Sequence, residues 1–181
     1  RAMIYLREEL FLSFVFVEAF IMDADKFDYQ VYKLSKSFFA QFIGKKDSEI
    51  LLKEQRPYNC LLIETKWEYF ICIPYRTEIR HQEAYLFKHT KRSKSHCSGL
   101  DYSKMIILED LSYIDSSPAI VDPDEFTETR KNINKIVKQA NAYLDTYINH
   151  CNGKKVLPEA TFRRKYRYST LKNFHDILGI K

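Results

Sequence analysis

The sequence predicts an α+β fold in a single compact domain. Strand-like segments cluster in the middle of the chain, and helical segments flank them. Two apolar, β-favouring runs at 58–64 and 68–75 are separated by the short stretch TKW, which predicts an antiparallel hairpin. The segments do not alternate as strand, helix, strand, so a sheet built from parallel crossover units is not expected.

The composition is that of one globular domain with a basic excess. The chain has 181 residues, of which 45% are hydrophobic and 29% charged, a balance that excludes wholesale disorder. The formal net charge of +5 permits an anionic partner without requiring one. The 13 tyrosines and 13 phenylalanines belong mostly in the core, and a few exposed rings could stack on bases.

The cysteines and glycines argue against a metal site and against a phosphate-binding glycine loop. None of the four cysteines forms a Cys-x-x-Cys pair, and Cys60 and Cys72 lie in apolar runs, where a free thiol behaves as a small hydrophobe. His89 and His96 near Cys97 are spaced too loosely to indicate a metal. The chain has only four glycines and no nucleotide-binding motif. We therefore expect no metal, no cofactor and a reduced, cytoplasmic protein.

Residues 1–21 form an apolar extension before the domain at 22–181. Its apolar run at 10–21 has 12 residues and contains Glu18, so it is too short to span a bilayer. The balanced charges before this run, and the absence of a small-residue cleavage site after it, argue against a signal peptide. The extension is either an extra helix or strand packed on the domain or a non-native leader, because Met22 begins a plausible domain of its own. No membrane partner is expected.

The first half of the domain is predicted to run from a helix into strands. Apolar residues recur at helical spacing between 28 and 43, which predicts an amphipathic helix that ends near Gly44. A short helix or connector ends before Pro57, and the hairpin follows. The later elements are expected as a third strand at 84–87, a basic loop at 88–99, an apolar strand at 104–110, and a short strand or extended connector at 117–123.

The second half is predicted to be helical. Asp122 is a good N-cap, Pro123 suits the first helical position, and Glu125 stands where a capping partner belongs. The apolar face of this helix comprises Phe126, Ile133, Val137, Ala140, Leu144 and Ile148. Asn152 and Gly153 end it, a basic connector follows, and Ser169 begins a final helix that stops at Gly179.

The stretch IPYRTEIRH at 73–81 closes an apolar strand with groups that suit phosphate chemistry. If the strand continues, alternate residues point to opposite faces; if the chain turns after Pro74, then Arg76, Thr77 and His81 can converge. Histidine exchanges protons near neutral pH, arginine neutralises phosphate, and threonine donates a hydrogen bond. These are the groups needed for metal-free RNA cleavage by a 2′-hydroxyl. Solvated strand ends often carry the same residue types.

Two further positions are candidates for the same chemistry. Arg56 immediately precedes the first hairpin strand, where it is also explained as a solvated charge. Lys104 begins the apolar strand at 104–110, and the preceding Asp101 could hold an arginine or a histidine in place. A turn followed by an edge lysine explains that segment equally well.

Basic residues gather in two places that could bind RNA. Residues 151–181 carry eight Lys and Arg against two acidic residues, a net +6 that exceeds the +5 of the whole chain. The stretch FRRKYRY at 162–168 interleaves cations with aromatic rings, a pattern that suits RNA, although exposed connectors are often charged as well. With the loop at 88–99, the candidate RNA-binding residues are Lys88, Lys91, Arg92, Arg163, Arg164, Lys165 and Arg167.

Three segments together resemble the toxins of type III toxin–antitoxin systems. RPYNCLLIETKWEYFICIPYRTEIRH is followed by GLDYSKMIIL and, near the end of the chain, by YSTLKNFHDILGI. The order of these motifs is similar to that of the TenpN branch of the ToxN, AbiQ and CptN endoribonuclease family. The resemblance covers roughly residues 27–180. Residues 1–21 have no counterpart in it, and the loop at 88–98 is longer and more basic than the family pattern.

The resemblance implies a strongly twisted antiparallel sheet flanked by helices and a sequence-selective, metal-independent endoribonuclease. Such enzymes leave 2′,3′-cyclic phosphate and 5′-hydroxyl ends. The implied partners are cellular or phage mRNA as substrate and a repetitive antitoxin RNA. The toxin cuts this RNA into pseudoknot units that inhibit it, and the two assemble into closed rings. Growth arrest during phage infection is the implied outcome.

Matched to the family motifs, the catalytic candidates are His81, Arg76, Thr77, Lys104 and Arg56. Asp101 and Tyr102 match the Asp-Tyr-Ser/Thr-Lys segment and are expected to support them. The ToxN branch has lysines where this chain has Ile79 and Arg80, so its catalytic assignments transfer poorly. Two other classes remain open: a non-catalytic RNA-binding protein and a protein-interaction domain with an incidental basic surface.

Overall fold

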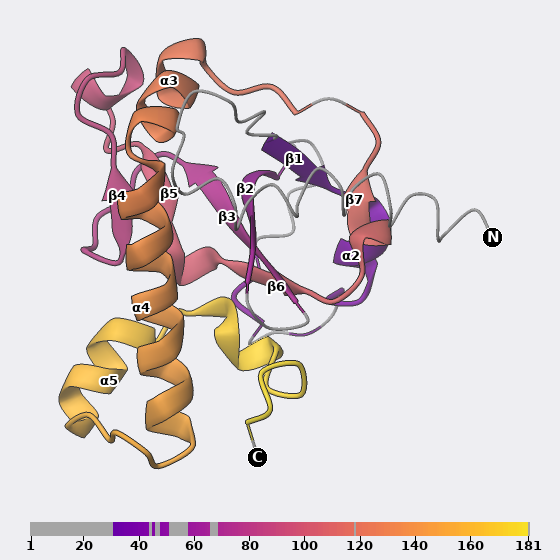
Figure 1. Cartoon of the computed structure of the whole chain (residues 1–181), viewed down its shortest axis with the longest axis vertical. Coiled ribbons are helices and arrows are strands. Elements are labelled where there is room, and N and C mark those ends of the chain that lie inside the picture. The colour runs from indigo at the N-terminus through magenta and orange to yellow at the C-terminus, as the bar shows by residue number, and fades with distance from the viewer. Residues whose placement is uncertain are drawn as a thin grey trace.

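The computed structural model describes residues 31–43, 45, 48–50, 58–65, 69–117 and 119–180. Within these ranges the chain forms a twisted antiparallel sheet flanked by helices (Figure 1), which confirms the predicted α+β class. The expectations for the extension at 1–21, for the connector before Pro57 and for Arg56 concern residues outside the described ranges.

Seven strands form the sheet, in the order β4-β5-β3-β2-β1-β7, with β6 also paired to β3. Their bounds are β1 (Val31–Leu34), β2 (Asn59–Glu64), β3 (Phe70–Arg76), β4 (Ala84–Leu86), β5 (Gly99–Asp101), β6 (Ile106–Leu108) and β7 (Ile114–Asp115). The predicted hairpin is confirmed, because β2 and β3 pair antiparallel from Cys60 opposite Pro74 to Glu64 opposite Phe70. Strand β3 is central, since β2, β5 and β6 all pair with it.

The helix predicted over 28–43 is wrong at residues 31–34, the first part of it that the structure describes. Val31–Leu34 is strand β1, which pairs antiparallel with both β2 and β7. Helix α2 covers only Lys36–Ala40 and begins where the Ser35 hydroxyl accepts a hydrogen bond from the Phe38 amide. Apolar residues spaced three or four apart are compatible with either structure over one turn, and the backbone hydrogen bonds to neighbouring strands decide in favour of β1.

The helices lie mainly in the second half of the chain, as α3 (Pro123–Lys131), α4 (Ile133–Cys151) and α5 (Glu159–Tyr166). The predicted long helix is therefore interrupted at Asn132, and α4 buries Ile136, Ala140, Tyr143, Leu144 and Tyr147. Helix α5 replaces the connector that the sequence predicted. The expected final helix is a 3-10 turn, η4 (Thr170–Asn173), which Ser169 caps as predicted by accepting from the Leu171 amide.

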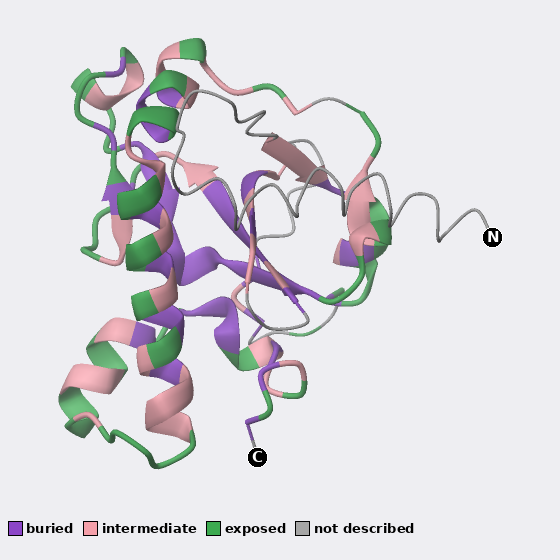
Figure 2. Ribbon diagram, viewed as in Figure 1, coloured by how far each residue is buried: buried purple, intermediate pink, exposed green. Residues whose placement is uncertain are grey.

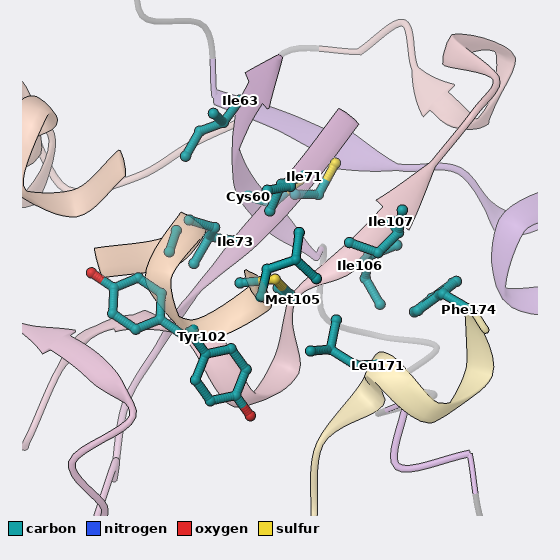
Figure 3. Packing of buried hydrophobic residues seen from close by; sticks show 14 of the residues in the cluster. Cys60, Ile63, Ile71, Ile73, Tyr102, Met105, Ile106, Ile107, Leu171 and Phe174 are labelled. Atoms are coloured by element: carbon teal, nitrogen blue, oxygen red, sulfur yellow. The ribbon is translucent and has the colours of Figure 1, made fainter. Parts of the chain in front are cut away.

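The core lies between the sheet and the C-terminal elements. Figure 3 shows side chains from β3, β6 and η4 meeting there, and Ile71, Ile106 and Leu171 are fully buried. Burying each such side chain contributes about 1.5–3 kcal/mol. Figure 2 shows the buried residues concentrated in the sheet, while the outer surfaces of α3 and α5 are exposed.

Helix α4 runs along the side of the molecule that carries β4 and β5, opposite β1, β7 and α2 (Figure 1). Among the described residues, no helix combines the length and the apolar character needed to cross a bilayer.

Candidate active site

The chain turns sharply where β3 ends, at the stretch that the sequence analysis singled out. Strand β3 extends through Arg76, and Glu78 then adopts a positive φ of 57°. Ile79 is buried, and its amide donates to the Cys97 carbonyl at 2.9 Å. Of the two alternatives left open by the sequence, the structure has the turn, although it comes after Arg76 and not after Pro74.

One buried carboxylate, that of Asp101, brings Arg76 and His81 together. Arg76 Nη1 donates to Asp101 Oδ2, and His81 Nε2 lies 3.4 Å from the same oxygen. The other oxygen, Oδ1, accepts from the Ser103 amide at 2.9 Å and from the Ser103 hydroxyl at 2.7 Å. The Asp101 side chain is fully buried, whereas Arg76 is 27% and His81 39% exposed. Arg76, His81, Asp101 and Ser103 form the candidate active site.

The register between β3 and β5 explains why Arg76 reaches Asp101. Arg76 lies opposite Gly99 in this antiparallel pair, so Asp101, two residues further along β5, is its diagonal neighbour on the same face. Gly99 is required there, because a Cβ at this position would lie 2.1 Å from the Tyr85 carbonyl oxygen of β4. The glycine therefore lets β4 approach β5 closely.

The electrostatics of the candidate site favour an ionised Asp101. Burial alone would raise the pKa of this carboxyl, because it removes water from the charged form. Hydrogen bonds from His81 and Ser103, together with the positive charges of His81 and Arg76, outweigh burial and lower the pKa of Asp101 below its ordinary value. The carboxylate is thus a permanent anion at neutral pH that can orient both side chains.

Other predicted residues lie near this cluster without joining it. Thr77 is half-buried at the start of the turn, and within the described ranges it forms no hydrogen bond with the cluster. Tyr102 is buried beneath it and donates from its hydroxyl to the side chain of Gln139 on α4 at 2.9 Å. Tyr102 therefore fixes the 3-10 turn η2 (Tyr102–Lys104) against the helix.

Lys104 is turned away from Arg76 and His81 and is fully engaged. Its ammonium donates to Glu49 Oε2 at 3.0 Å, to the Glu49 carbonyl at 3.1 Å and to the Tyr168 carbonyl at 2.7 Å. These acceptors use all three N–H groups of the ammonium. The side chain is only 10% exposed, so Lys104 ties the η2 turn to the C-terminal segment.

The basic loop at 88–99 is anchored to helix α3 by carboxylates. The amides of Lys88 and His89 donate to Glu128, each at 2.9 Å. Arg92 is paired with Asp122 at 2.6 Å and lies 3.6 Å from the buried Glu125, so its charge is compensated. The side chains of Lys88 and Lys91 are less constrained, since within the described part of the chain no acidic side chain pairs with them. Both lysine side chains are exposed.

Of the four C-terminal residues predicted to bind RNA, one side chain points inward and three are exposed. Lys165 pairs with Glu83 at 3.6 Å and lies over the rings of Tyr143 and Tyr166. The three exposed side chains are those of Arg163, Arg164 and Arg167. Among the residues that the structure describes, no carboxylate forms an ion pair with any of these three.

Sequence reasoning missed Ser103 and the engagement of Lys104. The spacing Asp-x-Ser at 101–103 is a signal for an Asx-type turn and could have revealed the serine. No local pattern could have revealed Glu49, which is 55 residues from Lys104. Across the described ranges, no group of three His, Cys, Asp or Glu side chains is arranged to hold a metal ion.

A scan against protein-family models, a search of curated proteins and a search of solved structures each gave no match to this chain.

Proposed function

We propose that this chain is a metal-independent endoribonuclease and the toxin of a type III toxin–antitoxin system of the TenpN branch. One observation carries the proposal: Asp101, a fully buried carboxylate, holds a histidine and an arginine side by side, and both remain partly open to solvent. A proton-transfer group beside a phosphate-binding cation is the combination that RNA cleavage by internal attack requires.

His81 would carry a proton in the reaction. The 2′-oxygen forms a bond to the adjacent phosphorus, the bond from phosphorus to the 5′-oxygen breaks, and a 2′,3′-cyclic phosphate and a 5′-hydroxyl result. A base removes the proton from the 2′-hydroxyl, and an acid protonates the leaving 5′-oxygen; His81 serves one of these two steps. Its Nε2 faces Asp101 and Ser103, each at 3.4 Å, which leaves Nδ1 for the substrate. Asp101 orients the imidazole ring.

Arg76 would stabilise the negative charge that builds on the phosphate. Asp101 accepts from one of the five N–H groups of Arg76, and within the described part of the chain no acceptor is recorded for the others, which could bind phosphate oxygens. Thr77 follows Arg76 directly at the start of the turn, and its hydroxyl could donate to the same phosphate. Such donors typically contribute about 10²- to 10³-fold to the rate.

The exposed cations support an RNA partner. Lys88 and Lys91 project from a loop that is joined to the catalytic turn through the Ile79 amide, and Arg163, Arg164 and Arg167 are exposed on α5 and at its end. Long RNA could contact both groups of cations. In the proposed biology, mRNA is the substrate, and processed pseudoknots of a repetitive antitoxin RNA inhibit the enzyme within a closed RNA–protein ring.

The test is cleavage of a short linear RNA in the presence of a metal chelator. We expect products that end in 2′,3′-cyclic phosphate and 5′-hydroxyl groups, identified by mass spectrometry. The His81→Ala variant, purified in parallel, controls for contaminating ribonucleases and should give no product above background. A strict requirement of the chemical step for a divalent ion would contradict the mechanism.

The competing class is a non-catalytic RNA-binding protein, favoured by the same exposed arginines. This class predicts that the wild-type protein binds RNA in a filter assay and that the recovered RNA is uncleaved at every pH and ion concentration tested. That result would exclude catalytic roles for His81 and Arg76. The exposed arginines would then only bind phosphates.

A further inference from the structure

A hollow on the surface lies along helix α5, from its first residue, Glu159, to Tyr168 just beyond its end. Its volume is about 680 Å³. It is lined by Glu159, Ala160, Arg163, Arg164, Arg167 and Tyr168. Three of the six lining residues are arginines and one is a carboxylate, so the hollow carries net positive charge and attracts anions.

Tyr168 is the unusual member of this set. It is 57% exposed, whereas the neighbouring Tyr166 is buried and donates from its hydroxyl to the Tyr143 carbonyl at 2.8 Å. The guanidinium of Arg167 lies 5.0 Å from the centroid of the Tyr168 ring. The exposed tyrosine is therefore already paired with a cation and is not used to fill the core.

We propose that this hollow binds one unpaired nucleobase of an RNA strand, which stacks on Tyr168 while Arg163, Arg164 and Arg167 hold the neighbouring phosphates. Binding of phosphate alone would require only the arginines and would not use the exposed tyrosine ring. An apolar ligand could pack on the ring, but its affinity would not increase through the three cations. A nucleotide uses both features, because its base has a π-face and its backbone is anionic. This inference rests on the proposed RNA substrate and adds a base-stacking subsite to it.

The subsite is fixed relative to the candidate active site by three contacts. The Tyr168 carbonyl accepts from Lys104 at 2.7 Å, and the Thr170 hydroxyl donates to the Met105 carbonyl, two residues beyond Ser103. Helix α5 is also tied by Lys165 to Glu83, two residues beyond His81. A base held on Tyr168 therefore sets which phosphate of the same strand can reach His81, so the subsite contributes to cleavage-site selection.

The experiment measures stacking directly, without cleavage. A single-stranded 2′-O-methyl oligonucleotide cannot be cut by internal attack, and 2-aminopurine placed at successive positions reports stacking by loss of fluorescence. With the wild-type protein we expect quenching at one position. Tyr168→Leu should remove this quenching and weaken binding about 5- to 150-fold, since base–aromatic stacking contributes about 1–3 kcal/mol per base.

Two matched variants separate the ring from general effects. Tyr168→Phe keeps the ring and should retain quenching and affinity. Val156→Ala removes an exposed apolar side chain, 66% exposed, in the connector before α5 and should change neither. Changing Arg163, Arg164 and Arg167 to alanine together should lower the slope of log affinity against log salt by about one unit per lost phosphate contact.

The outcomes distinguish this inference from the proposed nuclease. Wild-type affinity and quenching in Tyr168→Leu would overturn the stacking subsite and leave the cleavage test untouched. Equal competition by inorganic polyphosphate against wild type and Tyr168→Leu would likewise reduce the hollow to an anion patch. Tyr168-dependent quenching in a protein that does not cleave RNA would retain the subsite and reject the nuclease.

Discussion

Replacing Asp101 with asparagine isolates the charge at the centre of the candidate site. The amide is nearly the same size as the carboxylate, and its oxygen can still accept from the Ser103 amide and hydroxyl as Asp101 Oδ1 does. Its NH₂ group would then face Arg76 and His81, which are donors themselves. The substitution therefore removes the contacts to the two cationic side chains and preserves the turn.

The expected loss of stability follows from burial and the number of contacts. Breaking a buried ion pair typically costs about 3–5 kcal/mol, and a hydrogen bond to a charged group contributes about 1.5–3 kcal/mol. Because Arg76 is 27% and His81 39% exposed, water can partly solvate them when the carboxylate is gone. We therefore expect the free energy of unfolding of Asp101→Asn to fall by about 2–4 kcal/mol at pH 7.

The pH dependence gives this prediction a sign. The pKa of Asp101 is lowered in the folded protein, so its ionised form stabilises the fold. This contribution is complete above the unfolded-state pKa of about 3.9 and is lost as the pH falls through the lower folded-state pKa. In urea unfolding, the difference in unfolding free energy between wild type and Asp101→Asn should therefore shrink in strong acid, as Asp101 becomes protonated.

The matched control is Asp110→Asn. Asp110 caps an equivalent turn by accepting from the Ser112 amide at 2.8 Å, but it is exposed, and among the described residues it has no ion-pair partner. Its replacement should change the unfolding free energy by less than about 0.5 kcal/mol. RNA cleavage by Asp101→Asn should fall by about 10²-fold or more, because His81 loses its orienting anion. Equal stability of the two variants, or near wild-type cleavage by Asp101→Asn, would refute the reasoning.

Four further substitutions test neighbouring parts of the site. His81→Ala should abolish cleavage while RNA binding on filters stays near wild type, whereas Arg76→Ala should weaken both, because only the arginine grips phosphate. Lys104→Met should lower the urea midpoint, since a buried ammonium with three acceptors is lost; a cleavage loss without a stability loss would instead make Lys104 catalytic. Gly99→Ala should destabilise the fold by more than about 2 kcal/mol, because its Cβ would meet a backbone oxygen at 2.1 Å; an unchanged midpoint would show that β4 and β5 can separate at no cost.

The sequence predicted those elements whose local signals agree with their tertiary contacts. The hairpin strands β2 and β3 are strongly apolar and β-favouring, and they are buried next to each other in the sheet. Strand β1 shows the opposite case, because its four residues have helical spacing and become a strand only through pairing with β2 and β7. Local pattern contains no information about those partners.

Helix α5 was missed because its sequence has a weak apolar pattern. Only Tyr166 is buried among the residues of α5, and three consecutive basic residues interrupt the periodicity. The aromatic contacts that stabilise the helix come from α4, where the ring of Tyr147 stacks on Phe162 with centroids 5.8 Å apart. Tyr147 lies outside the segment, so the local sequence does not reveal this contact. The run of basic residues at 163–165 therefore resembles an exposed connector.

The candidate site could be predicted only as alternatives, because its geometry depends on a non-local register. The residue types at 73–81 indicated a proton-transfer group and a phosphate-binding cation, and Asp101 was considered as an orienting residue for one of them. The carboxylate of Asp101 contacts both Arg76 and His81. It reaches Arg76 because Arg76 lies opposite Gly99 in the β3–β5 pair. A shift of that register by one residue would turn Asp101 to the other face of the sheet and separate it from Arg76. The proposed chemistry therefore depends on the pairing of Arg76 with Gly99, which local sequence does not specify.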